Sequence, residues 1–126
     1  MSPDHAAWFA KGDEDLAMIE IAVAARGPWP QIAYHAQQLA EKYLKGFLVH
    51  HGTLPPRVHD LQRLVDLCAV HDPTLETLRE DCIGLTEAGA SARYPGWIDE
   101  PGEMDGQNAV ATAKRVRESI RARVPQ

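Results

Sequence analysis

The chain has 126 residues, a formal net charge of −5, 44% hydrophobic residues and 25% charged residues. This length suits a single domain over residues 1–126, with a core that needs neither a disulfide nor a metal ion. The composition is typical of a soluble globular protein, and the acidic balance disfavours a protein that coats nucleic acid regardless of sequence.

The first predicted helix follows a short lead-in. Residues 1–12 mix aromatic and polar side chains, and we interpret them as a loose N-terminal lead-in or a first turn. Asp13, Glu14 and Asp15 then supply an acidic first turn, which the positive end of the helix dipole stabilises. The expected buried stripe of this helix consists of Leu16, Ile19, Val23 and Arg26. The sequence Gly27-Pro28-Trp29-Pro30 ends the helix, because proline cannot continue a helix but suits the first turn of the next one.

Residues 31–51, QIAYHAQQLAEKYLKGFLVHH, predict one long helix, because they hold no proline, one glycine and many strong helix formers. Apolar residues occupy two neighbouring stripes, a band wide enough to contact two other helices. Because Glu41 precedes Lys45 by four residues, the two can form an ordinary helical ion pair, and a solvated face would need nothing more. The alternative is that this polar ridge is a working surface. Its members are His35, Gln37, Gln38, Glu41, Lys42 and Lys45.

Three further helices are expected after the proline-containing connector. The third opens within residues 57–61, the fourth spans residues 73–90 and the fifth spans residues 103–123. Asp60 and Asp72 are placed to cap the third and fourth helices. His59 either anchors the entry to the third helix or belongs to a polar site that faces the ridge. Residues 91–102 hold two prolines and two glycines, and they predict an irregular loop that packs onto the bundle.

These elements together predict an all-α fold, an antiparallel bundle of about five helices. Neither strand alternation nor an internal repeat occurs in the sequence. Residues 1–25 hold five acidic side chains and one lysine, whereas residues 107–126 hold five basic side chains and one glutamate. Much of this charge cancels if the first and last helices pack side by side, as they often do in antiparallel bundles.

Two features bear on the location of the protein in the cell. Cys68 and Cys82 match no metal or redox spacing, and we expect both to be buried thiols in a reducing cytosol. No apolar run approaches the roughly 20 residues that cross a bilayer. The first residues have neither a basic start nor a continuous apolar segment. We therefore expect a cytoplasmic protein.

The polar ridge lies in a stretch that resembles a known family. The string YHAQQLAEKYLKGFLVHHG, followed by His59-Asp60-Leu61, closely resembles the HEPN domain family of small helical bundles. In that family the second helix carries a similar pattern of His, Gln, Glu and Lys residues. Ala92-Arg93-Tyr94-Pro95 is similar to the family's Arg-Tyr-Pro segment. The resemblance extends from about Asp15 to Ile120, and it implies the same bundle fold.

The resemblance also implies one kind of catalysis. Many HEPN proteins are ribonucleases, typically toxins, with an Arg-x4-6-His motif contributed twice across a dimer interface. The arginine would stabilise a phosphate, and the histidine would act in general acid/base transfer. In this chain no histidine follows an arginine at that separation. His35 and Arg93 are therefore only candidate catalytic residues, and a metal-independent ribonuclease with a degenerate motif is our second hypothesis.

Another role that the resemblance implies is our first hypothesis. Small HEPN proteins bind nucleotides or act beside a separately encoded minimal nucleotidyltransferase, often in paired toxin–antitoxin modules. Lysine and arginine would then meet phosphates, histidine and glutamine a base or ribose, and tyrosine would stack. We expect a homodimer without a cofactor or a metal ion, since no two histidines have the three- or four-residue spacing that shares a metal on one helix face. A helical protein-interaction module is the third hypothesis. The candidate nucleotide-binding residues are His35, Gln38, Lys42, Lys45, His59, Arg93 and Tyr94.

Overall fold

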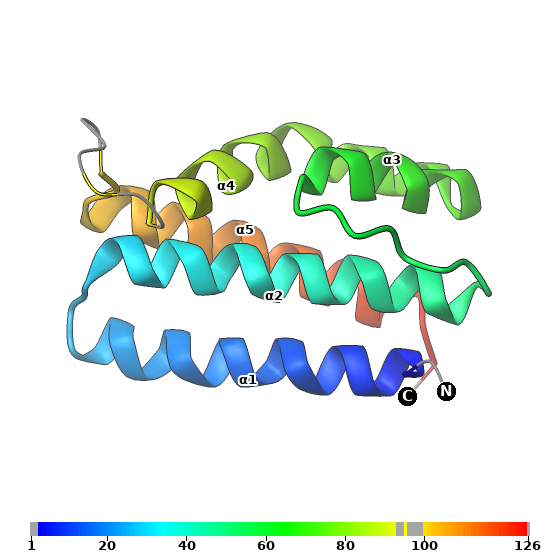
Figure 1. Ribbon diagram of the computed structural model, residues 1–126, viewed down its shortest axis with the longest axis horizontal. Coiled ribbons are helices and arrows are strands. Elements are labelled where there is room, and N and C mark those ends of the chain that lie inside the picture. The colour runs from blue at the N-terminus through cyan, green and yellow to red at the C-terminus, as the bar shows by residue number, and fades with distance from the viewer. Residues whose placement is uncertain (1–2, 93–94, 96–99, 126) are drawn as a thin grey trace.

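The computed structural model describes residues 3–92, 95 and 100–125, and these residues form helices joined by short connections (Figure 1). No strand occurs in these described ranges. The predicted all-α bundle of about five helices is therefore confirmed. The elements are α1 (His5–Ala24), α2 (Trp29–His50), α3 (Leu61–His71), the 3-10 helix η1 (Pro73–Leu78), α4 (Arg79–Ser91) and α5 (Glu103–Arg121).

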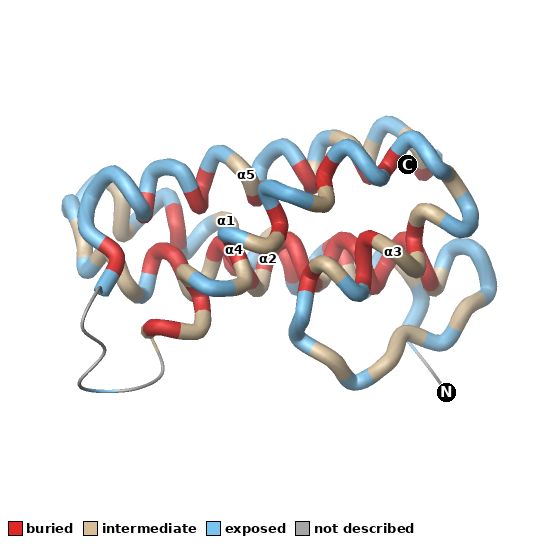
Figure 2. The backbone as a smooth tube through the Cα atoms, turned by 90° about the horizontal axis from the view of Figure 1, so that it is seen from above, coloured by how far each residue is buried: buried red, intermediate tan, exposed pale blue. Residues whose placement is uncertain are grey.

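The central element of the bundle is α2 (Figures 1 and 2). α1 runs antiparallel along one side of it, and α3, α4 and α5 pack against the rest of its surface. The two chain termini lie at the end of the bundle where α2 ends (Figure 1). The wide apolar band predicted for residues 31–51 is therefore used on several sides at once, because each neighbouring helix covers part of it.

α1 begins at His5, so the expected loose lead-in over residues 1–12 is wrong for residues 5–12. Asp4 is the N-cap, and its side chain accepts a hydrogen bond of 2.9 Å from the backbone N–H of Ala7. Phe9 is buried, and its ring stacks on that of Tyr43 with 4.5 Å between the centroids. The burial of this aromatic ring against α2 explains why the helix extends back past Gly12.

Two glycines allow α1 and α2 to approach closely. A Cβ atom added at Gly46 would lie 2.5 Å from the Phe9 ring, and one added at Gly12 would lie 3.0 Å from the Tyr43 ring. Both distances are shorter than ordinary contacts in a close-packed interior, so only glycine fits without movement of the rings. This close approach defines the rotation of α1 about its axis, and therefore which α1 side chains face the ridge on α2.

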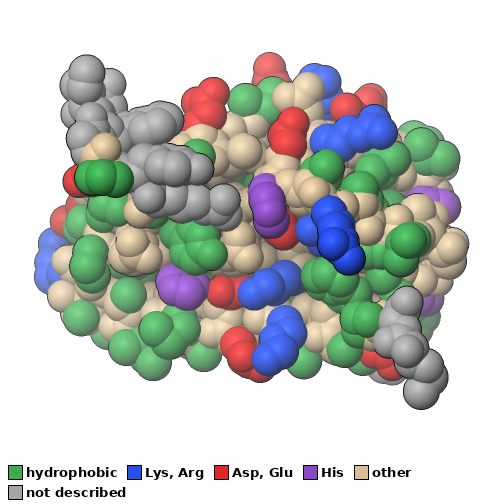
Figure 3. All heavy atoms as spheres, viewed as in Figure 1, with side chains coloured by type: hydrophobic (Ala, Val, Ile, Leu, Met, Phe, Trp, Pro, Cys, Tyr) green, Lys and Arg blue, Asp and Glu red, His purple; other side chains and the backbone are tan. Residues whose placement is uncertain are grey.

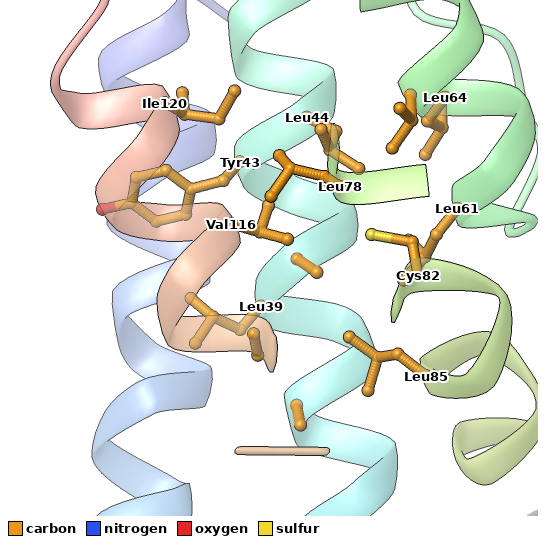
Figure 4. Packing of buried hydrophobic residues seen from close by; sticks show 14 of the residues in the cluster. Leu39, Tyr43, Leu44, Leu61, Leu64, Leu78, Cys82, Leu85, Val116 and Ile120 are labelled. Carbon is orange, nitrogen blue, oxygen red and sulfur yellow. The ribbon is translucent and has the colours of Figure 1, made fainter. Parts of the chain in front are cut away.

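The hydrophobic core surrounds α2 and reaches every other helix (Figure 4). On one side, Tyr43 and Leu39 of α2 lie near Val116 and Ile120 of α5. Cys68 and Cys82 are buried free thiols, as expected, and burial raises the pKa of each thiol to about 12. On the other side of α2, the residues labelled in Figure 4 are Leu44, Leu61, Leu64, Leu78, Cys82 and Leu85.

The predicted caps of the third and fourth helices are both present. The side chains of Asp60 and Asp72 accept hydrogen bonds of 3.0 Å from backbone N–H groups two residues further on. The fourth helix differs from the expectation, because its first part is the 3-10 helix η1 and the α-helix starts only at Arg79. A 3-10 helix aligns residues three apart, which turns both Leu75 and Leu78 into the core.

Ion pairs join α1 and its C-terminal end to α5. Arg26 pairs with Glu103 at 2.9 Å, and Arg117 pairs with Asp13 at 2.9 Å. Of the charges counted near the two ends of the sequence, Asp13 and Arg117 therefore offset each other. Arg26 does not belong to a buried stripe, which corrects the prediction: it follows α1, is exposed and has a φ of 61°.

Most of the segment between α4 and α5 lies outside the described residues, including Arg93 and Tyr94. The expectation that this loop packs onto the bundle therefore stays a prediction. Pro101, immediately before the glycine that precedes α5, is buried. Among the described residues, no helix combines the length and the apolar character that crossing a bilayer requires.

Candidate functional site

Polar side chains of α2 gather with those of α1 and of the connector before α3. Figure 3 shows histidine, lysine and acidic side chains side by side on this face, along the boundary of α1 with α2 and above it. Three segments of the chain therefore contribute to one surface. We call it the α2 polar surface, and its members are Asp15, His35, Gln37, Gln38, Glu41, Lys42, Lys45 and His59.

The first half of this surface is built around Asp15 of α1. Only 7% of Asp15 is exposed. Its Oδ1 lies 2.9 Å from Nδ1 of His35, and its Oδ2 accepts a hydrogen bond of 2.6 Å from the ammonium of Lys42. Because His35 and Lys42 are two turns apart on one side of α2, a single α1 carboxylate can reach both. Asp15 thereby orients two of the predicted site residues.

The second half is built around Glu41, which is also buried. Its carboxylate accepts hydrogen bonds from Gln37 at 3.0 Å and Lys45 at 3.1 Å, and it lies 3.0 Å from Nδ1 of His59. The Gln37 amide also donates to the backbone carbonyl of His59 at 3.1 Å, which holds the connector against α2. The predicted Glu41–Lys45 ion pair is confirmed, but it is buried instead of solvated.

The buried charges of the surface balance one another. Asp15 and Glu41 provide two negative charges, and Lys42 and Lys45 provide two positive charges. Burial of an ion pair is weak evidence for a stabilising role, because the desolvation penalty often equals or exceeds the attraction. The observable consequence of these pairs is orientation: they hold cationic and titratable side chains in defined positions at the surface.

Each histidine of the surface turns one ring nitrogen to a carboxylate. Nδ1 of His35 faces Asp15 and Nδ1 of His59 faces Glu41, so the Nε2 atoms are the nitrogens that can meet a ligand. A carboxylate partner fixes the orientation of the ring and selects the tautomer that carries the proton on Nδ1. Lys42 has three N–H donors, and a quarter of its side chain is exposed. These groups can donate to phosphate oxygens or transfer a proton.

The predicted site residues are not equally accessible. His35, Gln38 and Lys42 are half-buried and His59 is exposed, so all four can reach a ligand. Lys45 differs, because only 8% of its side chain is exposed and its ammonium lies between Glu41 and the ring of Trp8, 5.9 Å from the ring centroid. This burial favours a role for Lys45 in balancing Glu41 over direct phosphate contact. Arg93 and Tyr94, which were also predicted to bind the nucleotide, lie outside the described residues.

Sequence reasoning missed Asp15 and Trp8 as residues of this region. Asp15 was interpreted as a first-turn acid, and Trp8 was assigned to the lead-in. A helix that starts at the Asp4 cap changes both interpretations, since Trp8 and Asp15 are then seven residues apart on one face. The signal that could have found them is the spacing of Trp8, Gly12 and Asp15 after a capping aspartate.

The four other histidines meet at the end of the bundle. The ring centroids of His5 and His50 are 5.0 Å apart, and those of His51 and His71 are 4.6 Å apart in a stacked arrangement. Burial, followed by repulsion from His71 and His50, lowers the pKa of His51. Spacing within one helix could not reveal this cluster, because it joins three helices. In the part of the chain that the structure describes, no group of three or more His, Cys, Asp or Glu residues could hold a metal ion.

Comparison with known proteins gives one match. The sequence model of a family described as HEPN domain matches residues 5–123, which span α1 to the end of α5 and the whole α2 polar surface. No curated protein and no solved structure matches the chain.

Proposed function

Because the chain belongs to the HEPN domain family, we propose that it binds a nucleotide at the α2 polar surface and acts beside a separately encoded minimal nucleotidyltransferase in a toxin–antitoxin-like module. The observation that carries nucleotide binding is the buried Asp15 carboxylate, which holds the Lys42 ammonium and the His35 ring side by side where α1 meets α2. The partner enzyme is proposed from family membership.

The chemistry of the surface suits a phosphorylated ligand. Lys42 uses one donor for Asp15 and keeps others for phosphate oxygens. The Gln38 amide N–H donates to Gln37 at 2.8 Å, which leaves its carbonyl oxygen to accept a hydrogen bond from the ligand. His59 offers Nε2 from the opposite side of the surface. Cationic donors and neutral polar groups are thus available together, as recognition of a nucleotide requires.

Isothermal titration with ADP and ATP tests this proposal. Lys42→Met removes the half-buried ammonium, and loss of a charge-assisted hydrogen bond should weaken binding by about 10- to 150-fold. Lys114→Met is the matched control, because Lys114 is an exposed lysine on α5. Circular dichroism should show that both variants stay folded. Equal affinity of the two variants would contradict the assigned surface, and no nucleotide binding at all would favour a protein-interaction module.

The partner enzyme is tested separately by genomic context and co-purification. A gene for a small nucleotidyltransferase next to this one, with a product that co-purifies with this chain, is the expected result. Absence of stable association between the two purified proteins would remove this half of the proposal without affecting nucleotide binding.

A metal-independent ribonuclease is a second candidate function, favoured by the two carboxylate–histidine pairs. In such a reaction one histidine removes the proton of the ribose 2′-hydroxyl, the 2′-oxygen attacks phosphorus, and a second histidine protonates the leaving 5′-oxygen. RNA incubated in EDTA should be cleaved, and His35→Asn or His59→Asn should each slow cleavage by about 100-fold or more. His50→Asn, outside the surface, is the control. Undiminished cleavage in both site variants would exclude this mechanism.

We also propose that the chain is a homodimer that covers the outer face of α1. Met18 and Ile21 are 49% and 66% exposed there, and large apolar side chains exposed on one helix face are typical of an interface. Ile21→Glu should convert a dimer to a monomer in multi-angle light scattering. Val70→Glu, at an exposed valine of α3, should leave the dimer intact. A monomeric wild-type protein would contradict this assignment.

A further inference from the structure

A hollow beside the α2 polar surface combines apolar walls with an aromatic ring. Its volume is about 280 Å³, and it lies between the start of α1, the end of α2 and the connector that follows α2. Trp8 and Pro3 line it from the N-terminal side, Val49 from α2, and Leu54 and Pro55 from the connector. Leu54 is 80% exposed, so an apolar side chain stands open to solvent at this hollow.

The Trp8 ring links the hollow to the cationic groups of the polar surface. The Lys45 ammonium lies 5.9 Å from the centroid of the Trp8 ring, so the ring borders both regions. Lys42 and Val49 are seven residues apart on α2, which places them on the same side of the helix and roughly 10 Å apart along its axis. On α1, Lys11 falls between Trp8 and Asp15, and most of its side chain is exposed.

Two other hollows among the described residues lack this combination. One of about 670 Å³ is lined by Asp66, Glu76 and Glu80 together with Thr77 and Arg79. Another of about 290 Å³ runs between α4 and α5 and includes Glu80, Asp81 and Asp105. Several carboxylates face each of these two hollows, and their negative charge disfavours a phosphorylated ligand. Neither hollow is lined by an aromatic side chain on which a base could stack.

We infer that the hollow lined by Trp8, Val49 and Leu54 receives the base of the bound nucleotide, while its phosphates lie at Lys42. This inference rests on the proposed function and assigns the part of the site that recognises the nucleotide base. Ligand pockets that enclose a whole drug-sized molecule measure roughly 300–1,000 Å³, so a smaller hollow suits one ring system with the ribose and phosphates outside it. An aromatic side chain stacks any base, because every base has a π-face.

The geometry also orients the ligand. The base lies at the end of the bundle against Trp8, and the chain of phosphates runs along the boundary of α1 and α2 toward Asp15. Lys42 meets phosphate oxygens there, and Lys11 can approach the same phosphates from α1. The His35 ring lies at the far end of this path, where its Nε2 can contact the terminal phosphate. A nucleoside diphosphate is therefore the ligand class that fits both regions.

The test compares ADP with inorganic pyrophosphate, which lacks the base and the ribose. Trp8→Leu keeps an apolar side chain beside Gly46 but removes the aromatic surface, and Leu54→Asp places a charge at the hollow. Each variant should bind ADP about 5- to 150-fold more weakly, the loss that removal of one stacked base gives. Pyrophosphate binding should be unchanged in both. Val70→Asp is the matched control for Leu54→Asp, because the two side chains are similarly exposed, at 78% and 80%.

The possible outcomes separate this inference from the proposed function. If Trp8→Leu and Leu54→Asp bind ADP like the wild type while Lys42→Met does not, the phosphate site stands and the base lies elsewhere. If wild-type protein binds neither ADP nor pyrophosphate, both proposals are wrong. Quenching of Trp8 emission by ADP but not by pyrophosphate, absent in Trp8→Leu, is the direct spectroscopic result expected for a stacked base.

Discussion

Neutralising Glu41 provides a direct test of how the α2 polar surface is held together. Glu41→Gln removes the negative charge that faces the Lys45 ammonium at 3.1 Å, and the two side chains are only 6% and 8% exposed. The buried Lys45 ammonium then has neither solvent nor, among the described residues, a second carboxylate in contact to balance its charge. Breaking a buried ion pair from one side typically costs about 3–5 kcal/mol, because an uncompensated charge is left in the interior.

This loss is large compared with the stability of a small domain. A total unfolding free energy of about 5–15 kcal/mol would fall by a fifth or more, and the melting temperature would fall by roughly 10–20 °C. The interaction can be isolated with a double-mutant cycle that adds Lys45→Met and the double variant. The double variant should be more stable than Glu41→Gln alone, since it leaves no unpaired buried charge. Urea unfolding followed by circular dichroism measures all four proteins.

The exposed pair of Lys11 and Glu14 supplies the control. Both side chains are 67% exposed at a separation of 3.4 Å, and such surface pairs contribute at most about 1 kcal/mol. Glu14→Gln should therefore change stability little. If Glu41→Gln also costs less than about 1 kcal/mol, the Glu41–Lys45 pair is hydrated in solution, and the polar surface is not organised by buried charge.

Positions outside the polar surface give three further expectations. Gly46→Ala should lower the unfolding free energy by about 1–3 kcal/mol in chemical denaturation, because its Cβ would lie 2.5 Å from the Phe9 ring, and a stabilised variant would contradict the close packing of α1 on α2. The pKa of His51 is lower in the folded state than in the unfolded state, so protonation favours the unfolded chain. The contribution of His51 to stability is therefore complete above about pH 6.5 and is lost as the pH falls from there toward the lower folded pKa. In thermal melts from pH 7 to 5, His51→Gln should show a smaller decline in melting temperature than the wild type. Cys68 and Cys82, whose pKa values burial raises to about 12, should react with a thiol reagent at pH 8 only as the protein unfolds, and rapid labelling of the native protein would refute their burial.

The sequence predicted those parts of the fold that depend on local chemistry. Pro28 and Pro30 marked the start of α2, and Asp60 and Asp72 marked the starts of α3 and η1, because capping and proline geometry act within a few residues. The apolar band of α2 predicted a central helix for a similar reason, since periodicity reports burial without knowledge of the partners.

Only the arrangement of the α2 residues of the candidate site could be predicted from the sequence. The remaining contacts depend on how α1 and the connector before α3 pack against α2. His35 and Lys42 could be placed on one side of α2 from spacing alone. Their shared partner Asp15 could not, because its contact depends on the rotation of α1 about its axis. His59 reaches Glu41 only through the path of the connector, which no local rule specifies. Missing the Asp4 cap had the largest effect, because it removed Trp8 from the helix that carries Asp15.

One packing contact accounts for the position of both halves of the proposed nucleotide site. Trp8, Gly12 and Asp15 share a face of α1 at spacings of four and three residues, and Gly12 at the middle of that face lies against the Tyr43 ring. Successive residues of a helix are about 100° apart, so a shift of α1 by one residue would turn Trp8 and Asp15 away from α2 together. The close approach at Gly12 and Gly46 prevents that shift, because any larger side chain in their places would meet an aromatic ring. The stacked rings of Phe9 and Tyr43 therefore support the site without touching a ligand, and the same packing that stabilises the bundle aligns Trp8 with the hollow and Asp15 with Lys42.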